Sequence, residues 1–337
     1  MIRPLCRLVR IAAAVGGAAA ADDRAEALPS RCVTIRLSVD RTRWWNHATE
    51  VAETIDGLVP VVKGNGYGFG RANLAIAAGR LSEIIAVGTV YELDGLPDGV
   101  TVVVLTPTLQ APASTEPVLT VGSHRHIDAL DGWQGRVVVK LESGMHRYGG
   151  GIQLVAEAQL AGLRTVGVAI HPPLAGTDEE RLATIEAQLP GIDPSLDVWL
   201  SHLSPGAYES LPTTHRYKLR VGTYLWHGDR EAIKLEADVL DTRPVAAGTT
   251  AGYRLVPIDR DGTLVMVGAG SAAGVAPLPD GRSPFHFARA RLDLVEPPHM
   301  HTSMVVVPRG QSCPIPGDWV DLQRPLTMTS ADELRWI

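Results

Sequence analysis

The sequence of 337 residues is long enough for two domains with separate cores, and its 45% hydrophobic and 20% charged residues are typical of a soluble globular enzyme. The formal net charge is −6, and acidic and basic residues are interspersed without a basic stripe, which argues against nucleic-acid binding. Cys6, Cys32 and Cys313 are widely spaced, so they form no metal-ligand pattern and indicate a reducing, cytoplasmic setting rather than a disulfide scaffold.

The N-terminal segment, residues 1–34, is predicted to be an extension outside the folded domains. Arg3, Arg7 and Arg10 precede Ile11–Ala21, a run of small apolar residues, and this order has the outline of a signal peptide. The run is mostly Ala and Gly, so it is too short and too weakly hydrophobic to span a membrane, and no later segment is apolar enough to do so. A disordered extension, an upstream start codon and export by a weak signal remain open alternatives.

Between residues 35 and 237, short apolar runs alternate with helix-like stretches. This alternation is typical of a parallel sheet buried on both faces. Roughly 200 residues of it predict a (β/α)8 barrel, with a doubly wound sheet as the second choice, since no Gly-x-Gly-x-x-Gly follows the first strand. The predicted strands are Val59–Lys63, Ile84–Gly88, Val100–Thr106, Arg136–Leu141, Thr165–His171, Asp197–His202 and Lys218–Leu225, and the clearest predicted helices are Ala72–Leu81, Ile152–Ala161 and Asp178–Leu189.

From residue 238 to residue 337 the helical periodicity disappears. Short β-like runs alternate with Gly and Pro turns, which predicts an all-β domain. The runs are Leu264–Val267, Ala288–Leu294, Ser303–Val307 and Asp318–Leu322.

Lys63 ends an apolar run that begins at Leu58, and a glycine-rich turn containing Tyr67 follows it. Burial disfavours the charged ammonium and favours the free amine, which is the form that attacks a carbonyl group. Glycines let the backbone approach an anion such as phosphate, and Tyr67 can offer its hydroxyl to the same anion. The alternative is a snorkelling lysine before an ordinary loop, and this stretch alone does not decide between the two.

Other polar residues also fall where predicted strands end. Barrel enzymes place their active sites at the C-terminal ends of the strands, so these positions predict one site. Besides Lys63, they are Lys140 with Arg147, His171, Ser201, His202, Ser204 and Arg220.

Four segments, in a single order along the chain, resemble motifs of the alanine racemases, a family of fold type III pyridoxal-phosphate enzymes. Val61–Gly70 resembles the cofactor-lysine motif, and residues 137–149 resemble a strand leading into Gly-Met-x-Arg-x-Gly. Residues 219–225 resemble the segment Val-Arg-x-Gly-x-x-x-Tyr, although the tyrosine does not stand at the family's spacing. Residues 248–253 resemble the segment that carries the second catalytic base. The resemblance covers roughly residues 34–322 and implies a barrel followed by a β-domain, a homodimer with shared active sites, and interconversion of L- and D-alanine.

The resemblance also implies a role for each matching residue. Lys63 would carry pyridoxal 5′-phosphate as a Schiff base and act as one base, and Tyr253 of the other subunit would be the second base on the opposite face. Arg147 matches an arginine that hydrogen-bonds this tyrosine, and Lys140 matches a lysine that is often carbamylated and orients the arginine. The remaining matches are the cofactor-binding residues Tyr67, His171, Ser204, Arg220, Gly222 and Thr223, with Ser201 as the alternative to Ser204, and Met300 at the substrate entrance.

Other positions depart from the family. Ser271 stands where the family has a tyrosine, His301 replaces an aspartate, and the C-terminal domain reads as shortened. These changes leave open a racemase of another amino acid, a D-amino-acid aldolase or decarboxylase on the same scaffold, or a degenerate cofactor-binding paralogue. The C-terminal domain has no Cys-Asp pair, which the decarboxylase branch would use, so the sequence does not support a decarboxylase. His299, His301 and Cys313 do not have the spacing of a recognised metal site, so no metal is expected.

Overall fold

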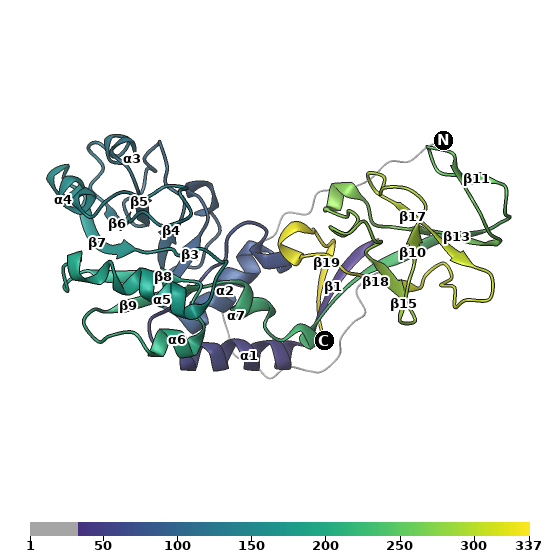
Figure 1. Cartoon of the computed structure of the whole chain (residues 1–337), viewed down its shortest axis with the longest axis horizontal. Coiled ribbons are helices and arrows are strands. Elements are labelled where there is room, and N and C mark those ends of the chain that lie inside the picture. The colour runs from purple at the N-terminus through teal and green to yellow at the C-terminus, as the bar shows by residue number, and fades with distance from the viewer. Residues whose placement is uncertain (1–32) are drawn as a thin grey trace, which may run out of the picture. The chain divides into compact units, whose positions relative to one another are not determined.

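The computed structural model describes residues 33–337. The predicted N-terminal extension, residues 1–34, therefore lies outside the described part of the chain except for residues 33 and 34. Two large β-sheets organise the described residues (Figure 1). One is an all-parallel barrel and the other is a mostly antiparallel sheet, which confirms the predicted α/β barrel followed by an all-β region.

The barrel has eight parallel strands, each hydrogen-bonded to the next in the order β2-β9-β8-β7-β6-β5-β4-β3. The sheet closes between β2 and β3, where Val61 and Ala86 form a parallel bridge and the Val62 N–H donates to the Ala86 carbonyl over 2.8 Å. Val, Ile and Leu are frequent in these strands because both faces are covered. The strands are β2 (Leu58–Pro60), β3 (Ile84–Val87), β4 (Thr101–Val104), β5 (Val118–Val121), β6 (Arg136–Lys140), β7 (Arg164–Ala169), β8 (Asp197–Ser201) and β9 (Tyr217–Val221).

Most barrel strands are joined by helices, and none of the helices within residues 33–337 is long and apolar enough to cross a membrane. The first helix begins where Asp40 accepts a hydrogen bond from the Arg43 N–H over 3.0 Å, and Trp44, Ala48 and Val51 form its buried face. The helices are α1 (Arg41–Thr54), α2 (Arg71–Leu81), α3 (His124–Asp128), α4 (Gln153–Leu160), α5 (Asp178–Glu186), α6 (Pro205–Glu209) and α7 (Thr223–His227).

Some elements differ from the predicted ones. The predicted strand Lys218–Leu225 is wrong beyond Val221, because Gly222 turns the chain and caps α7. The predicted strand Ala288–Leu294 is also wrong as a continuous element, because Ala288 and Arg289 have φ values of 48° and 67° and form a turn. The patterns predicted neither β5, which has only four residues, nor α1, whose apolar positions are interrupted by charged ones.

The second sheet has the order β15-β14-β18-β10-β13-β17-β16. β1 precedes the barrel in sequence but pairs antiparallel with β10 and parallel with β19, so the purple and yellow strands lie side by side in Figure 1. The boundary expected after residue 237 falls inside β10, and the division of the chain at that residue stays a prediction. The strands are β1 (Ile35–Val39), β10 (Ile233–Val245), β13 (Gly262–Val267), β14 (Phe285–Phe287), β15 (Ala290–Arg291), β16 (Asp293–Leu294), β17 (Ser303–Pro308), β18 (Trp319–Leu322) and β19 (Glu333–Trp336).

The last residues of the chain support the turn that follows β2. The Asn65 side-chain amide donates to the Leu326 carbonyl over 2.8 Å and to the Thr329 carbonyl over 3.1 Å. A Cβ on Gly68 would lie 2.9 Å from the Leu326 side chain, so the two segments are closely packed. The turn that carries Lys63 is therefore held by residues from the other end of the described chain.

Candidate active site

A cavity of about 920 Å³ is lined by residues that follow β2, β4, β7, β8 and β9, at the C-terminal ends of the barrel strands. Barrel enzymes use this face for their active sites. Every residue predicted to bind a cofactor lines this one cavity: Lys63, Tyr67, His171, Ser204, Arg220, Gly222 and Thr223, together with Ser201 and His202.

The turn after β2 has an unusual backbone. Gly66 has a φ of 64°, and Tyr67 has a φ of 55°, a left-handed conformation that is uncommon for a bulky residue. Asn65 holds this turn by accepting a hydrogen bond from the Gly68 N–H over 3.2 Å. The fixed turn places the buried Tyr67 ring and the Lys63 side chain at the same cavity.

The Lys63 amine lies in a positively charged environment. Partial removal of water lowers its pKa, and the guanidinium groups of Arg147 and Arg220 lower it further. The Glu92 carboxylate acts in the opposite direction on this pKa, and it also accepts a hydrogen bond from the Gly64 N–H over 3.2 Å. Lys63 remains solvent-accessible through the open cavity, so a carbonyl compound can reach an amine whose pKa is below that of an ordinary lysine.

Tyr67 and Gly222 meet in the wall of the cavity. A Cβ on Gly222 would lie 2.0 Å from the Tyr67 hydroxyl oxygen, so only glycine fits there. Burial raises the pKa of Tyr67 to about 12, and the protonated hydroxyl can donate to an anion. Gly222 also caps α7, whose first backbone N–H groups, such as that of Thr223, have no partner within the helix. Together with the exposed hydroxyl of Ser204, these donors suit a phosphate group.

Arg220 is fixed by neighbouring strands. Its Nε donates to the Leu200 carbonyl over 3.0 Å, and its Nη2 donates to Nδ1 of His171 over 3.4 Å. Burial lowers the pKa of Arg220 to about 10, which leaves it charged near neutral pH. Burial and the Arg220 charge lower the pKa of His171 to about 2, so its imidazole is neutral. Ser201 is buried and hydrogen-bonded to His171, whereas Ser204 is exposed.

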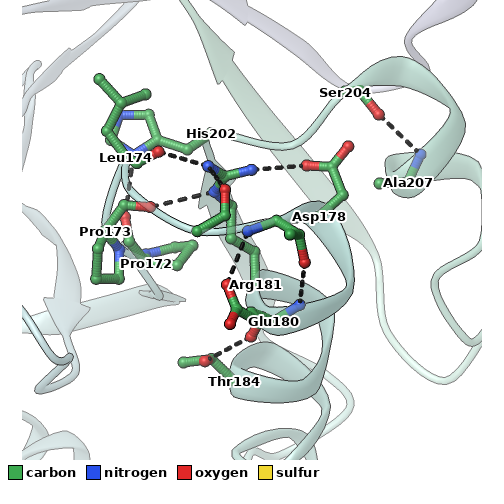
Figure 2. Close-up of polar contacts among 12 residues, drawn as sticks. Pro172, Pro173, Leu174, Asp178, Glu180, Arg181, Thr184, His202, Ser204 and Ala207 are labelled. Carbon is green, nitrogen blue, oxygen red and sulfur yellow. Dashed lines mark hydrogen bonds and ion pairs between the residues drawn. The ribbon is translucent and has the colours of Figure 1, made fainter.

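The loop between β7 and α5 contributes cavity residues that the motifs did not indicate. Figure 2 shows how Arg181 organises it: the guanidinium donates to the Pro173 carbonyl over 3.2 Å and pairs with Asp178 over 3.0 Å. Hydrogen bonds from Ser204 and Arg181 hold the pKa of Asp178 below its usual value. The sequence did contain a signal for the start of this helix, because Thr177 and Glu180 have the spacing of a capping box. The box starts α5 and places Asp178 and Arg181 one turn apart.

Lys140 is the last residue of β6 and is only 2% exposed. Its amine donates to the Tyr148 carbonyl over 2.7 Å. Burial, followed by the charges of Arg147 and Arg220, lowers the pKa of Lys140 to about 8, so part of this amine is neutral near physiological pH. Arg147 lies in an irregular turn; it is exposed, and its guanidinium lies 4.5 Å from the centre of the Tyr148 ring.

Residues 39–229 match the family described as alanine racemase, N-terminal domain. The chain belongs to the alanine racemase family. Its fold is similar to the alanine racemases of Bartonella henselae (TM-score 0.70, 19% identity), Acinetobacter baumannii (0.69, 16%) and Streptomyces coelicolor (0.68, 20%). Each similarity covers 90% of this chain, and 99%, 99% and 98% of the three relatives respectively. No match is found among the curated proteins.

Three residues that the alanine racemase motifs assign to catalysis or substrate do not line the cavity that contains Lys63: Arg147, Tyr253 and Met300. Tyr253 is 85% exposed in the turn between β11 (Thr250–Ala251) and β12 (Val256–Pro257), and Met300 is 67% exposed ahead of β17. One chain therefore brings the predicted cofactor residues together but leaves the predicted second base apart from them.

The two positions that depart from the family motifs lie close to Met300. His301 follows it directly, and the backbone of Ser271 is joined to the same segment, since the Ser271 N–H donates to the His299 carbonyl over 2.8 Å. In residues 33–337, no group of three or more His, Cys, Asp or Glu side chains is placed to hold a metal ion. Nε2 of His299 lies 2.6 Å from Oε1 of Glu296.

Proposed function

We propose that this protein is a pyridoxal-phosphate-dependent isomerase that interconverts L- and D-alanine. The observation that carries the proposal is the single cavity lined by Lys63, Tyr67, Gly222 and Arg220. It combines an amine with a lowered pKa, donors suited to a phosphate and a fixed cation. The related protein of Bartonella henselae contains covalently bound pyridoxal phosphate, which supports the same cofactor here.

The side chains around the cavity fit this cofactor. Lys63 would hold it covalently, and Tyr67, Ser204 and the backbone N–H groups of Gly222 and Thr223 would hold its phosphate. When bound, the cofactor supplies an electron sink for a carbanion at the substrate Cα.

Arg220 and His171 would lie beside the cofactor ring. A neighbouring cation disfavours protonation of the ring nitrogen, which weakens the electron sink and limits side reactions. Because the lowered pKa of His171 keeps the imidazole neutral, the histidine can accept a hydrogen bond from Arg220 without adding a second charge.

Racemisation requires a proton to leave one face of Cα and another to arrive at the opposite face, and two bases do this directly. Lys63 is the proposed base on one face. The partner's Tyr253 is the proposed base on the other, because a chain's own Tyr253 lies outside its cavity. This arrangement needs at least a homodimer, whose isologous pairing gives two equal sites. Arg147 would bind substrate and hydrogen-bond the partner's Tyr253, and Met300 would lie at the entrance.

Lys140 is proposed to carry a carbamate that orients Arg147. The neutral amine implied by its pKa of about 8 can add to carbon dioxide: an N–C bond forms, one C–O π bond of carbon dioxide breaks and one proton is released, so the neutral amine becomes a negatively charged carbamate. The intact mass of active protein tests this, measured after equilibration with and without carbon dioxide. A mass increase of one carbon dioxide, lost in Lys140→Met, is expected; active protein with a free Lys140 amine would refute it.

Alanine is the proposed substrate, and supply of D-alanine in the cytoplasm is the proposed use. Ser271 and His301 keep other outcomes open: a racemase of another amino acid, a D-amino-acid aldolase or decarboxylase, or a paralogue that only binds the cofactor. Holoenzyme incubated in deuterated water with L-alanine, D-alanine or L-serine separates these outcomes. Deuterium at Cα with inversion supports racemisation, and the fastest substrate identifies the amino acid. Exchange without inversion would mean that only one base acts, and no exchange would refute a racemase of alanine or serine.

A further inference from the structure

The turn that presents Tyr253 is held by one buried carboxylate. Glu296, only 7% exposed, accepts hydrogen bonds from two successive backbone N–H groups, that of Tyr253 over 2.7 Å and that of Arg254 over 3.1 Å. The two carboxylate oxygens each take one of these bonds, so the peptide plane between the two residues is fixed relative to Glu296.

The backbone on both sides of Tyr253 is shaped for this contact. Gly252 has a φ of 77°, and a Cβ there would lie 2.2 Å from Oε1 of Glu296, so the carboxylate packs directly on the turn. Leu255 also has a left-handed φ, of 49°, which is uncommon for a large side chain and persists only when neighbouring contacts hold it. The turn is therefore specified by its partner rather than by local preference.

His299 extends the same contact to the Tyr253 side chain. Its Nε2 lies 2.6 Å from Oε1 of Glu296, and its ring stacks on the phenol with centroids 4.3 Å apart at 31°. The hydrogen bond from His299, followed by those from the Tyr253 and Arg254 backbone, lowers the pKa of Glu296. An ionised carboxylate only accepts, so Nε2 of His299 carries the proton. An 85% exposed tyrosine would otherwise sample several rotamers, and the stacked ring restricts them.

We infer that Glu296 and His299 are positioning residues for Tyr253: the carboxylate fixes its backbone, and the imidazole fixes the direction of its phenol. This inference rests on the proposed function, in which Tyr253 is the second base. Neither residue reaches the reacting atoms; both act through Tyr253. Catalysis by a positioned base depends strongly on geometry, and a misplacement of about 1 Å can reduce a rate roughly a hundredfold.

The test uses the holoenzyme with Glu296→Ala, Glu296→Gln, His299→Ala and His299→Phe, each compared with Tyr253→Phe. We expect kcat to fall roughly tenfold to a hundredfold in the two Ala variants. Cofactor absorbance should be unchanged, because Lys63 and the cavity are intact. Glu296→Gln keeps one acceptor oxygen and His299→Phe keeps an aromatic ring, so each should retain more activity than its Ala counterpart. Glu236→Gln is the matched control, because Glu236, on β10, is a second buried carboxylate, 4% exposed.

A role through Tyr253 predicts two further results that a general structural role does not. In a Tyr253→Phe background, adding Glu296→Ala or His299→Ala should cause no further loss. In deuterated water, the Ala variants should slow Cα exchange from one alanine enantiomer more than from the other, because only the proton transfer of Tyr253 is affected. Equal slowing with both enantiomers, additive losses in the double variants, or wild-type kcat in Glu296→Ala would overturn the inference. Wild-type racemisation by Tyr253→Phe would instead overturn the two-base function on which the inference rests.

Discussion

The Tyr67 hydroxyl occupies the space in which a side chain at residue 222 would begin, since a Cβ on Gly222 would lie 2.0 Å from the phenol oxygen. Tyr67 comes from the turn after β2, and Gly222 follows β9, the strand that pairs with β2 in parallel. The contact therefore links the turn carrying the proposed cofactor lysine to the proposed phosphate site.

Gly222→Ala should weaken cofactor binding. The added methyl group displaces the Tyr67 hydroxyl, and a lost hydrogen bond to a charged group is worth about 1.5–3 kcal/mol, so the Kd for pyridoxal 5′-phosphate should rise about tenfold or more. Titration of apo-protein with the cofactor measures this. Gly191→Ala is the control, since the nearest atom to its Cβ would be at 3.9 Å, in ordinary contact. An unchanged Kd in Gly222→Ala would contradict the phosphate assignment.

Lys63→Ala should abolish the visible absorbance of the bound cofactor, because the amine that would bind it covalently is missing. In the wild type, capture of the cofactor by apo-protein should accelerate as pH rises and level off above the Lys63 pKa, which is lower than that of an ordinary lysine. Removing the Glu92 charge should lower this pKa further, so Glu92→Gln should shift the rise in rate toward lower pH. Stopped-flow absorbance measures the profile, with Glu50→Gln on the exposed face of α1 as control. A shift toward higher pH would contradict this electrostatic account.

Lys140→Met should stabilise the apo-protein in buffer free of carbon dioxide. The pKa of Lys140 is lowered from 10.5 to about 8, so between these values the unfolded chain binds more protons than the folded one. The destabilisation by Lys140 is therefore complete below about pH 8 and disappears as pH rises toward 10.5. The gain in free energy of unfolding should be on the order of 1–3 kcal/mol at pH 7 and shrink at higher pH. Urea unfolding measures it, with Lys218→Met, at another strand lysine, as the control.

The grouping of the predicted cofactor residues around one cavity could be predicted from the sequence because its parts are local. Lys63 and Tyr67 lie in one turn, Arg220 and Gly222 lie at the end of one strand, and each strand end faces the same cavity of a parallel barrel. A short apolar run identifies the strands that carry these residues, and the barrel geometry then brings the strand ends together.

Non-local contacts could not be predicted in the same way. The pairing of β1 with both β10 and β19 depends on register between distant segments, which no periodicity encodes. The contact of Glu296 with the Tyr253 turn likewise joins residues 43 positions apart, through backbone N–H groups that any residue carries. The resemblance pointed to Tyr253 itself, but only the structure shows what holds it.

Mixing the Lys63→Ala and Tyr253→Phe variants tests whether Tyr253 acts across a subunit interface. A site built from two chains needs Lys63 from one and the partner's Tyr253 from the other. In a hybrid dimer of Lys63→Ala and Tyr253→Phe, one site has both wild-type residues and the other has neither. Random exchange in an equal mixture makes half of the dimers hybrids, so activity should return to about a quarter of the wild-type value. If both bases came from the same chain, every site would lack one of them and mixing would restore nothing. Lys63→Ala mixed with the double variant Lys63→Ala/Tyr253→Phe must stay inactive under either arrangement, which controls for residual wild-type protein.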